Sequence, residues 1–197
     1  MERREPGRTK GIVLPLLFCF VLLACQSPEK TTGAKKYFNA EQANIRTQRG
    51  ITFLGKEPLS GIVFSLDAAG DTVMLVPYAN GKENGMAKAW YRKNQLKEIR
   101  YFVNGKKEGR HYGWHENGKP RFEYFFRNDE FNGSFKEWLP NGMLLLSLNF
   151  ENGHENGLQQ TWFADGKIKS NYIIKNGRRY GLLGTKNCVN VSDDIPR

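Results

Sequence analysis

A period of 24 residues constrains this chain more than any other feature of its sequence. Glycine recurs at that step, and three further columns keep the same phase. Tryptophan, or leucine in the first unit, occupies the sixth position, glycine or asparagine the tenth, and asparagine the twentieth. The columns are Gly61, Gly85, Gly109, Gly133, Gly157 and Gly181; Trp90, Trp114, Trp138 and Trp162; Gly70, Asn94, Gly118, Gly142 and Gly166; and Asn80, Asn104, Asn128, Asn152 and Asn176. Because all four tryptophans of the chain share one column, we read the sequence as an array of stacked repeats.

Each unit contains two turn signals, which divide it into two strands. Asn117-Gly118, Asn141-Gly142 and Asp165-Gly166 are dipeptides that two-residue type I′ turns prefer, because both central residues need positive φ. The second signal, Asn-Gly or Asn-Asp at the twentieth position, is followed closely by the next opening glycine and predicts a wider loop. Apolar residues alternate between the signals, as from Phe122 to Phe126. The sequence therefore predicts an all-β fold, an elongated antiparallel meander of β-hairpins.

The period also sets the boundaries of the array. Units begin at residues 61, 85, 109, 133 and 157, and the stretch 51–61 resembles the second half of an earlier, incomplete unit. We therefore expect the array to cover residues 51–184 and a C-terminal coda to cover 185–197. The segment 37–49 is compatible with a short N-terminal helix, because it alone departs from the alternating pattern.

The N-terminus carries a targeting signal. Residues 1–10 are polar and basic, and residues 11–24 form an apolar run of about 14 residues, shorter than the ~20 that span a bilayer. This pattern predicts a secretory signal peptide over residues 1–24. A plain signal peptide with a nearby cysteine, or an N-terminal membrane anchor, is the alternative reading.

The end of the apolar run narrows that choice. Leu22-Leu23-Ala24-Cys25 resembles the lipobox of bacterial lipoproteins. The resemblance implies that Cys25 is lipidated and becomes the first residue of the mature chain, so that membrane binding passes through it. Residues 25–50 would then hold a lipid-anchored tether and the short helix. Gln26 in place of aspartate favours the outer membrane, by the same resemblance.

The spaced Gly, Trp and Asn-Gly columns resemble MORN repeats, in particular the bacterial variant of about this length. The resemblance covers about residues 51–184 and implies hairpins that pair with their neighbours in a long, gently twisted sheet. Many bacterial sequences of this kind carry the name of a toxin–antitoxin antitoxin family. An antitoxin acts in the cytoplasm, which a lipobox does not favour. We therefore rank the antitoxin second, as the alternative function.

The tryptophan column defines one face of the predicted sheet. Because one repeat cannot bury its apolar face alone, we expect Trp90, Trp114, Trp138 and Trp162 to form a structural spine rather than a ligand site. The opposite face would carry the candidate binding residues Tyr91, His111, His115, Phe135, Leu139 and Phe163. Left uncovered, these side chains would form a binding strip; the alternative is that they pack against one another.

The sequence gives little support for chemistry. No catalytic motif occurs, so we expect no enzyme activity and no cofactor. His111 and His115 would lie about 13 Å apart on a strand, too far to share a metal ion. With Cys19 and Cys25 in the N-terminal segment, Cys188 stands alone in the rest of the chain, which excludes a disulfide framework, and we expect it to be inert.

Charge suggests the class of partner. The formal net charge is +10, and no block of five basic residues occurs. The first property favours anionic partners, and the second gives no reason to expect nucleic acid. We therefore expect a lipid-anchored, non-enzymatic binding or scaffold module of the bacterial cell envelope. Its partner would be an envelope protein, a glycan or an anionic polymer.

Overall fold

The computed structural model describes residues 35–92 and 94–184. Within these ranges the chain forms strands β1 to β18 and no helix, which confirms the predicted all-β class. The predictions for residues 1–24, for Cys25 and for the coda 185–197 lie outside the described residues. None of the described segments forms an apolar helix long enough to cross a membrane.

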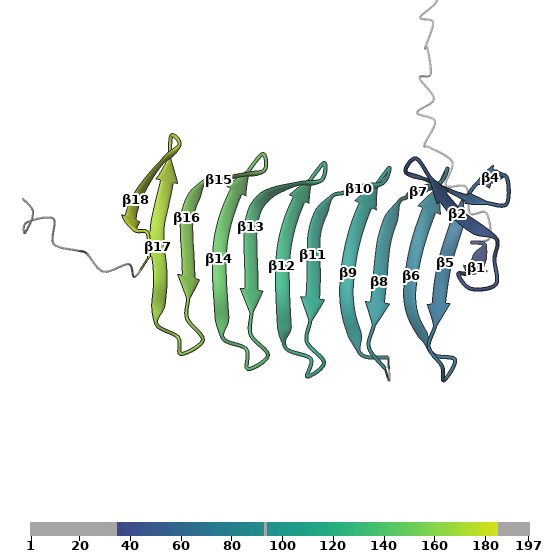
Figure 1. The fold of residues 1–197 in the computed structure, drawn as a ribbon, viewed down its shortest axis with the longest axis horizontal. Helices are drawn as coiled ribbons and strands as arrows, with labels where there is room; N and C mark the ends of the chain where they lie inside the picture. The colour runs from purple at the N-terminus through teal and green to yellow at the C-terminus, as the bar shows by residue number, and fades with distance from the viewer. Residues whose placement is uncertain (1–34, 93, 185–197) are drawn as a thin grey trace, which may run out of the picture. The chain divides into compact units, whose positions relative to one another are not determined.

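Each 24-residue unit contributes one hairpin to a single long sheet (Figure 1). Neighbouring hairpins are hydrogen-bonded to each other as well, so the sheet continues from unit to unit. This arrangement confirms the predicted antiparallel meander of hairpins. Its main strands are β5 (Gly61–Leu66), β6 (Thr72–Ala79), β8 (Gly85–Trp90), β9 (Leu96–Val103), β11 (Gly109–Trp114), β12 (Pro120–Arg127), β13 (Glu130–Trp138), β14 (Leu144–Glu151), β16 (Gly157–Trp162), β17 (Ile168–Lys175) and β18 (Arg178–Leu182). Short strands β7 (Lys82–Glu83), β10 (Lys106–Lys107) and β15 (His154–Glu155) pair with the ends of β6, β9 and β14.

The predicted helix over residues 37–49 was wrong, because that segment forms strands. They are β1 (Tyr37–Asn39) and β2 (Ile45–Gln48), and β2 joins β3 (Ile51–Leu54) and β4 (Glu57–Pro58) in a separate small sheet. β1 runs parallel to β5, where the Ile62 N–H donates to the Lys36 carbonyl at 2.8 Å and the Ala40 N–H to the Phe64 carbonyl at 2.8 Å. The open edge of β5 thus supplies backbone partners that a short isolated helix would have to find within itself.

The two turn types are the reverse of those predicted. Both residues of the second signal have positive φ, as in Asn104 (51°) and Gly105 (82°), so the tight type I′ turn lies there. At the first signal the His115 N–H donates to the Lys119 carbonyl and the Gly118 N–H to the His115 carbonyl, both at 2.9 Å. That pattern is a three-residue loop with a positive φ (80°) at Gly118. The Asn-Gly dipeptide suits both loops, since each needs a residue with positive φ, and therefore could not distinguish them.

The opening glycine of each unit lies opposite a large side chain on the second strand. Gly85 pairs with Phe102, and Gly109 pairs with Phe126. Gly109 also has a φ of +71°, in the region that glycine adopts without strain. The role of Gly109 is conformational, because a Cβ added there would meet no atom within 4 Å, and a Cβ added to Gly85 would meet Pro77 at 3.3 Å rather than the Phe102 ring.

Side chains also join successive units at the tight turns of the first three units. There the backbone N–H of the asparagine that opens the turn donates to the side chain of the residue just before the opening glycine of that unit. Asn84 Oδ1 accepts from the Asn104 N–H at 3.0 Å, and Glu108 Oε2 accepts from the Asn128 N–H at 2.9 Å. These bonds satisfy turn donors that the sheet ladder leaves free.

The sheet has two faces of different character. Side chains at the first, third and fifth positions of a unit, and their cross-strand partners, form what we call the core face. The buried members of this face are Val63, Val76, Ala87, Phe102, His111, Phe122, Phe126, Gln159, Ser170 and Ile174. Its rings pack across strands, with centroids 4.1 Å apart for Tyr124 and Phe135 and 4.6 Å for Phe126 and Phe131. The opposite side, which carries the second, fourth and sixth positions, is called the Trp face below.

Candidate functional site

The tryptophan column lies on the Trp face, and its members are half-buried rather than buried. Trp90, Trp114, Trp138 and Trp162 end the first strands of four successive units. Trp114 stacks on Tyr112 of the same strand, with ring centroids 6.1 Å apart and planes at 29°. Trp114 is therefore packed against its own strand, and all four indoles are open to solvent in part.

The six candidate binding residues do not form one exposed strip. His111 and Phe135 do face away from the tryptophans, but they lie in the packed part of the core face. Only 1% of His111 is exposed, and Phe135 contacts the rings of Tyr124, Phe131 and Phe150. The expectation of an open face opposite the tryptophans was therefore wrong for these two residues. Large side chains of adjacent units cover one another there, which was the alternative reading.

The other four, Tyr91, His115, Leu139 and Phe163, begin the three-residue loops, just beyond the strands. The alternation that defines a sheet face ends at the sixth position, so these residues follow loop geometry instead. The Tyr91 hydroxyl donates to the Trp114 carbonyl at 3.1 Å, and His115 Nε2 lies 2.8 Å from the Trp138 carbonyl. Both contacts reach the next unit. Phe163, 39% exposed, has the Lys169 ammonium 5.8 Å from its ring centre.

The buried imidazole of His111 is a structural group. Its Nε2 lies 2.9 Å from the Tyr101 carbonyl, and burial lowers the pKa of the ring below its ordinary value. Gln159 occupies the same position two units later, where its amide donates to the Asn149 carbonyl at 2.7 Å. Histidine and glutamine thus perform the same task, bonding a carbonyl of the preceding strand. Among the described residues, no three His, Cys, Asp or Glu side chains are placed to hold a metal ion.

A charged network on the core face was not foreseen from the sequence. Glu98 pairs with Arg100 at 2.8 Å and with Arg121, which stands at a bulge in β12. The Tyr124 hydroxyl donates to Glu137. Burial raises the pKa of Tyr124 above its ordinary value, and the hydrogen bond to Glu137 raises it further. The members neutralise one another, so the network leaves no free charge for a ligand. No pattern of spacing marks it, because it depends on which side chains the bulge turns inward.

The exposed large apolar side chains gather on the Trp face. Those assigned to it by their cross-strand partners are Tyr37, Met86, Tyr101, Leu158, Ile173, Tyr180 and Leu182. Tyr37 is 57% exposed and Met86 is 51% exposed. Exposed apolar groups that accumulate on one side of a sheet are typical of an interaction surface. The Trp face, rather than the face opposite it, is therefore the candidate site.

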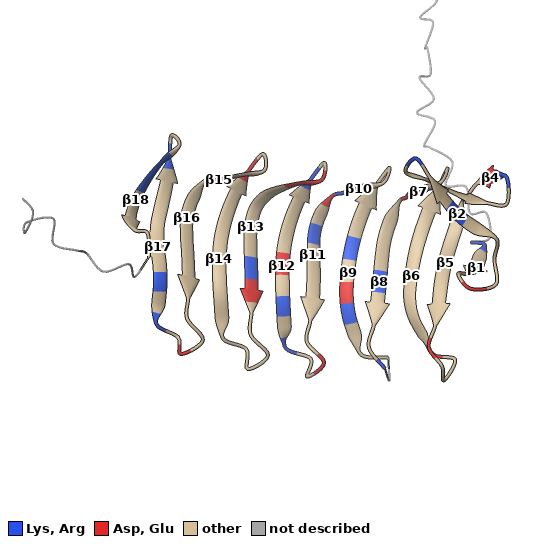
Figure 2. Cartoon of the chain, viewed as in Figure 1, with Lys and Arg blue, Asp and Glu red and all other residues tan. Residues whose placement is uncertain are grey.

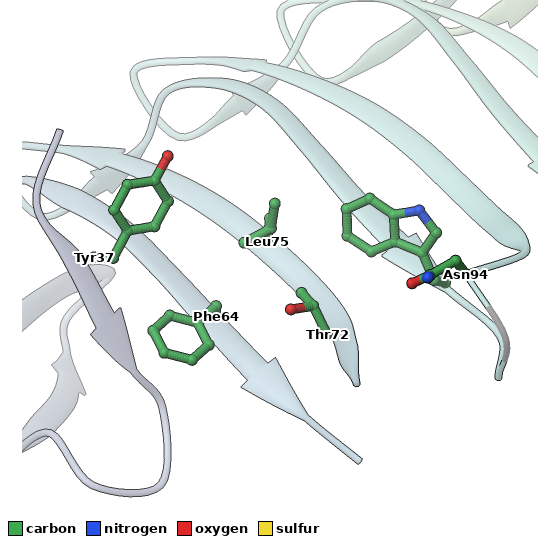
Figure 3. A pocket seen from close by; sticks show the side chains of 6 residues that line it. Tyr37, Phe64, Thr72, Leu75 and Asn94 are labelled. Carbon is green, nitrogen blue, oxygen red and sulfur yellow. The ribbon is translucent and has the colours of Figure 1, made fainter. Parts of the chain in front are cut away.

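A hollow lies at the N-terminal end of the Trp face (Figure 3). It has a volume of about 510 Å³ and is lined by Tyr37, Phe64, Thr72, Leu75, Trp90 and Asn94. The hollow exists because the first unit has Leu66 in the tryptophan column and Thr72 as its partner, both smaller than an indole. It combines aromatic walls with a hydroxyl and an amide, a composition common in small-ligand sites.

A second hollow of about 520 Å³ adjoins the first. It shares Tyr37 and Leu75 with it, and adds Ile62, Pro77, Met86, Lys35 and Lys88 among its lining residues. The described residues that line the two hollows include two lysines and no acidic side chain. On the sheet as a whole, charged side chains concentrate on the central strands β8 to β13, and β5, β6 and β16 carry none (Figure 2).

The fold and its columns define a β-hairpin repeat protein. Residues 107–128, which contain β11 and β12, match the MORN repeat variant. The match covers 22 residues, slightly less than one 24-residue period of the array, and the other units repeat its columns. No curated protein matches the chain.

Proposed function

We propose that this protein is a non-enzymatic binding module of the bacterial cell envelope, anchored by lipid at Cys25, with the Trp face as its binding surface. The observation that carries the proposal is the asymmetry of the sheet. The large side chains of the core face pack against one another, whereas the Trp face leaves apolar side chains exposed toward both ends of the array, such as Met86 and Tyr101 at one end and Leu158 at the other. The half-buried tryptophans add one contact in each of four successive units, and a contact at a regular step suits an extended partner.

The anchor is supported by the residues around Cys25. A basic segment, a short apolar run and Leu22-Leu23-Ala24-Cys25 stand in the order that lipoprotein processing requires. Eleven residues separate Cys25 from Tyr37, and an extended chain of this length spans at most ~40 Å. Acylation of Cys25 would thus keep β1 and the adjoining hollows close to a membrane surface.

Metabolic labelling tests the anchor. A palmitate analogue should mark the wild type, whereas Cys25→Ala should stay unlabelled and accumulate as a longer precursor. Cys19→Ala, which changes the other cysteine of the apolar run, should label normally. Equal labelling of wild type and Cys25→Ala would refute the anchor, and recovery of both in the cytosol would favour the antitoxin alternative.

Retention of envelope components tests the surface. Full-length protein and the variants Met86→Ser and Tyr101→Ser, both on the Trp face, should be compared in pull-downs from envelope extracts. We expect both variants to lose partner while their unfolding midpoints change little, because both side chains are more than 40% exposed. Thr47→Ser, on the separate small sheet, is the control. Unchanged retention by both Trp-face variants would refute the assignment of this face.

A further inference from the structure

The four tryptophans form a row that crosses the sheet at right angles to its strands. They stand on β8, β11, β13 and β16, and the row continues through the residue paired with each of them, Leu96, Pro120, Leu144 and Ile168. One strand therefore lies between the strands of successive indoles, and two interstrand spacings give a step of roughly 9.6 Å. Each indole is half-buried, so part of it is open to a ligand.

We propose that this row binds a linear anionic polysaccharide that lies across the strands, with one pair of sugars for each 24-residue unit. The inference rests on the proposed function, since it names the ligand of the same face. An indole stacks on the apolar C–H face of a pyranose ring. An extended β-1,4-linked chain presents an equivalent ring every second sugar, at a spacing close to that of the indoles.

The step of the row distinguishes a sugar chain from an extended peptide. Side chains on one face of a peptide strand repeat every ~6.8 Å, about 3 Å less than the ~9.6 Å between indoles. Over the three steps from Trp90 to Trp162 the mismatch would accumulate to about 8 Å, more than one residue of peptide. A peptide could therefore meet one or two indoles in register, whereas a two-sugar repeat meets all four.

The row of tryptophans ends at the hollow that Trp90 lines. In the unit that begins at Gly61 the indole is replaced by Leu66, and the hollow lies at Thr72, the residue paired with Leu66. Its volume of about 510 Å³ is within the range of small-ligand sites, and is sufficient for a sugar ring. The Thr72 hydroxyl and the Asn94 amide lie on its wall and supply the polar groups that a sugar hydroxyl requires.

Charge complementarity favours an acidic sugar. Lys35 and Lys88 line the second hollow, with no carboxylate among its described lining residues. Lys136 lies in the same cross-strand row as Lys88, and the one carboxylate between them, Glu123, is paired with Arg110 of the same face. The hollow of the core face differs, because Glu83 and Glu98 line it together with Arg100 and Lys107. The Trp face therefore has an excess of positive charge beside its aromatic row.

The test uses β-1,4-linked mannuronate oligomers of two, four, six and eight sugars with the full-length protein. Since all four tryptophans stand in the row, the intrinsic fluorescence of the protein reports contact with the ligand directly. We expect affinity to rise with each added pair of sugars up to eight. Trp138→Ala should weaken binding of the octamer about three- to tenfold, the loss of one aromatic stacking contact.

Charge variants keep the test independent of folding. Lys88→Gln and Lys136→Gln change half-buried side chains and should each weaken binding of the octamer, with a larger effect at low salt. Lys56→Gln removes the same charge from an exposed position in the turn between β3 and β4, and should bind as the wild type does. Circular dichroism and unfolding midpoints establish that the variants compared are folded.

Three outcomes would overturn the proposal. Affinity for mannuronates that does not depend on oligomer length would show that charge alone acts. The same conclusion would follow if polyglutamate bound as tightly as the mannuronate octamer and Trp138→Ala left that binding unchanged. Tighter binding of neutral cello-oligomers than of mannuronates would refute the acidic sugar. Retention of an envelope protein or of anionic lipid vesicles on the Trp face, with no oligosaccharide binding, would refute the polysaccharide and leave the proposed binding face standing.

Discussion

Gly113 offers a direct test of how the core face is packed. It occupies the fifth position of its unit, where the other units have Ser65, Ala89, Glu137 and Thr161. A Cβ added to Gly113 would stand 2.2 Å from Phe122 Cε1. Its φ lies outside the left-handed region, so the effect of Gly113→Ala would be steric alone. Phe122 is 6% exposed and stacks on Tyr124, with centroids 4.5 Å apart, which restricts the movement that would relieve the clash.

We expect Gly113→Ala to destabilise the protein by about 2 kcal/mol, within the range for overpacking a core. That loss corresponds to a decrease in Tm of roughly 4–8 °C for a chain of this size. Urea unfolding followed by fluorescence and circular dichroism would measure it. The control is Gly177→Ala, which has a φ of +71° and no atom within 4 Å of the added Cβ. It should cost about 1 kcal/mol through backbone strain alone.

A double-mutant cycle identifies the clashing partner. Phe122→Leu removes part of the ring that the new methyl group meets, so it should cost less in the Gly113→Ala background than in the wild type. A coupling free energy of at least ~0.5 kcal/mol is expected for two residues in contact. Additive effects, or a Gly113→Ala variant as stable as Gly177→Ala, would refute the packing described for the core face.

Two further predictions concern a buried imidazole and the N-terminal sheet. Because burial lowers the pKa of His111, the unfolded state binds its proton more readily, and stability should fall as the pH drops below ~6.5. His111→Gln places the residue of position 159 at this site and should make the unfolding midpoint less dependent on pH between about pH 7.5 and 5. A pH dependence equal to that of the wild type would contradict this account. Gly81→Ala should destabilise the protein more than Gly105→Ala, since both have positive φ but only Gly81 would bring a Cβ within 2.7 Å of the Thr52 carbonyl. Equal unfolding midpoints of these two variants would argue against packing of the small sheet on the first tight turn.

The hairpin array was predictable because its signals are local and repeated. Glycines such as Gly85 and Gly109 mark a position with positive φ in each unit, and the alternation of apolar and polar residues predicts each strand. The strands over residues 37–49 were not predictable in the same way. β1 is three residues long and exists because the edge of β5 supplies its hydrogen bonds, a partner distant in sequence.

The two faces of the sheet could be separated from the sequence but not ranked by burial. The alternation of apolar and polar residues correctly predicted that His111 and Trp114 lie on opposite faces of the sheet. It does not predict on which face the large rings of adjacent units pack against one another. The residue pairs that decide this are cross-strand contacts such as Tyr124 with Phe135. The hollow beside Tyr37 escaped notice for the same reason, because it forms where β1 meets a unit that lacks the indole.

The side-chain bonds from Asn84 to Asn104 and from Glu108 to Asn128 have an evolutionary consequence. Each connects positions 20 residues apart, and the bond recurs in the first three units, so duplication of 24 residues among them restores the same bond at the new junction. The crossover point need not coincide with a hairpin boundary, since two sites one period apart occupy the same place in the hairpin. Related genes should therefore differ in length by multiples of 72 base pairs, and each gain would extend the reach of the protein by roughly 9.6 Å.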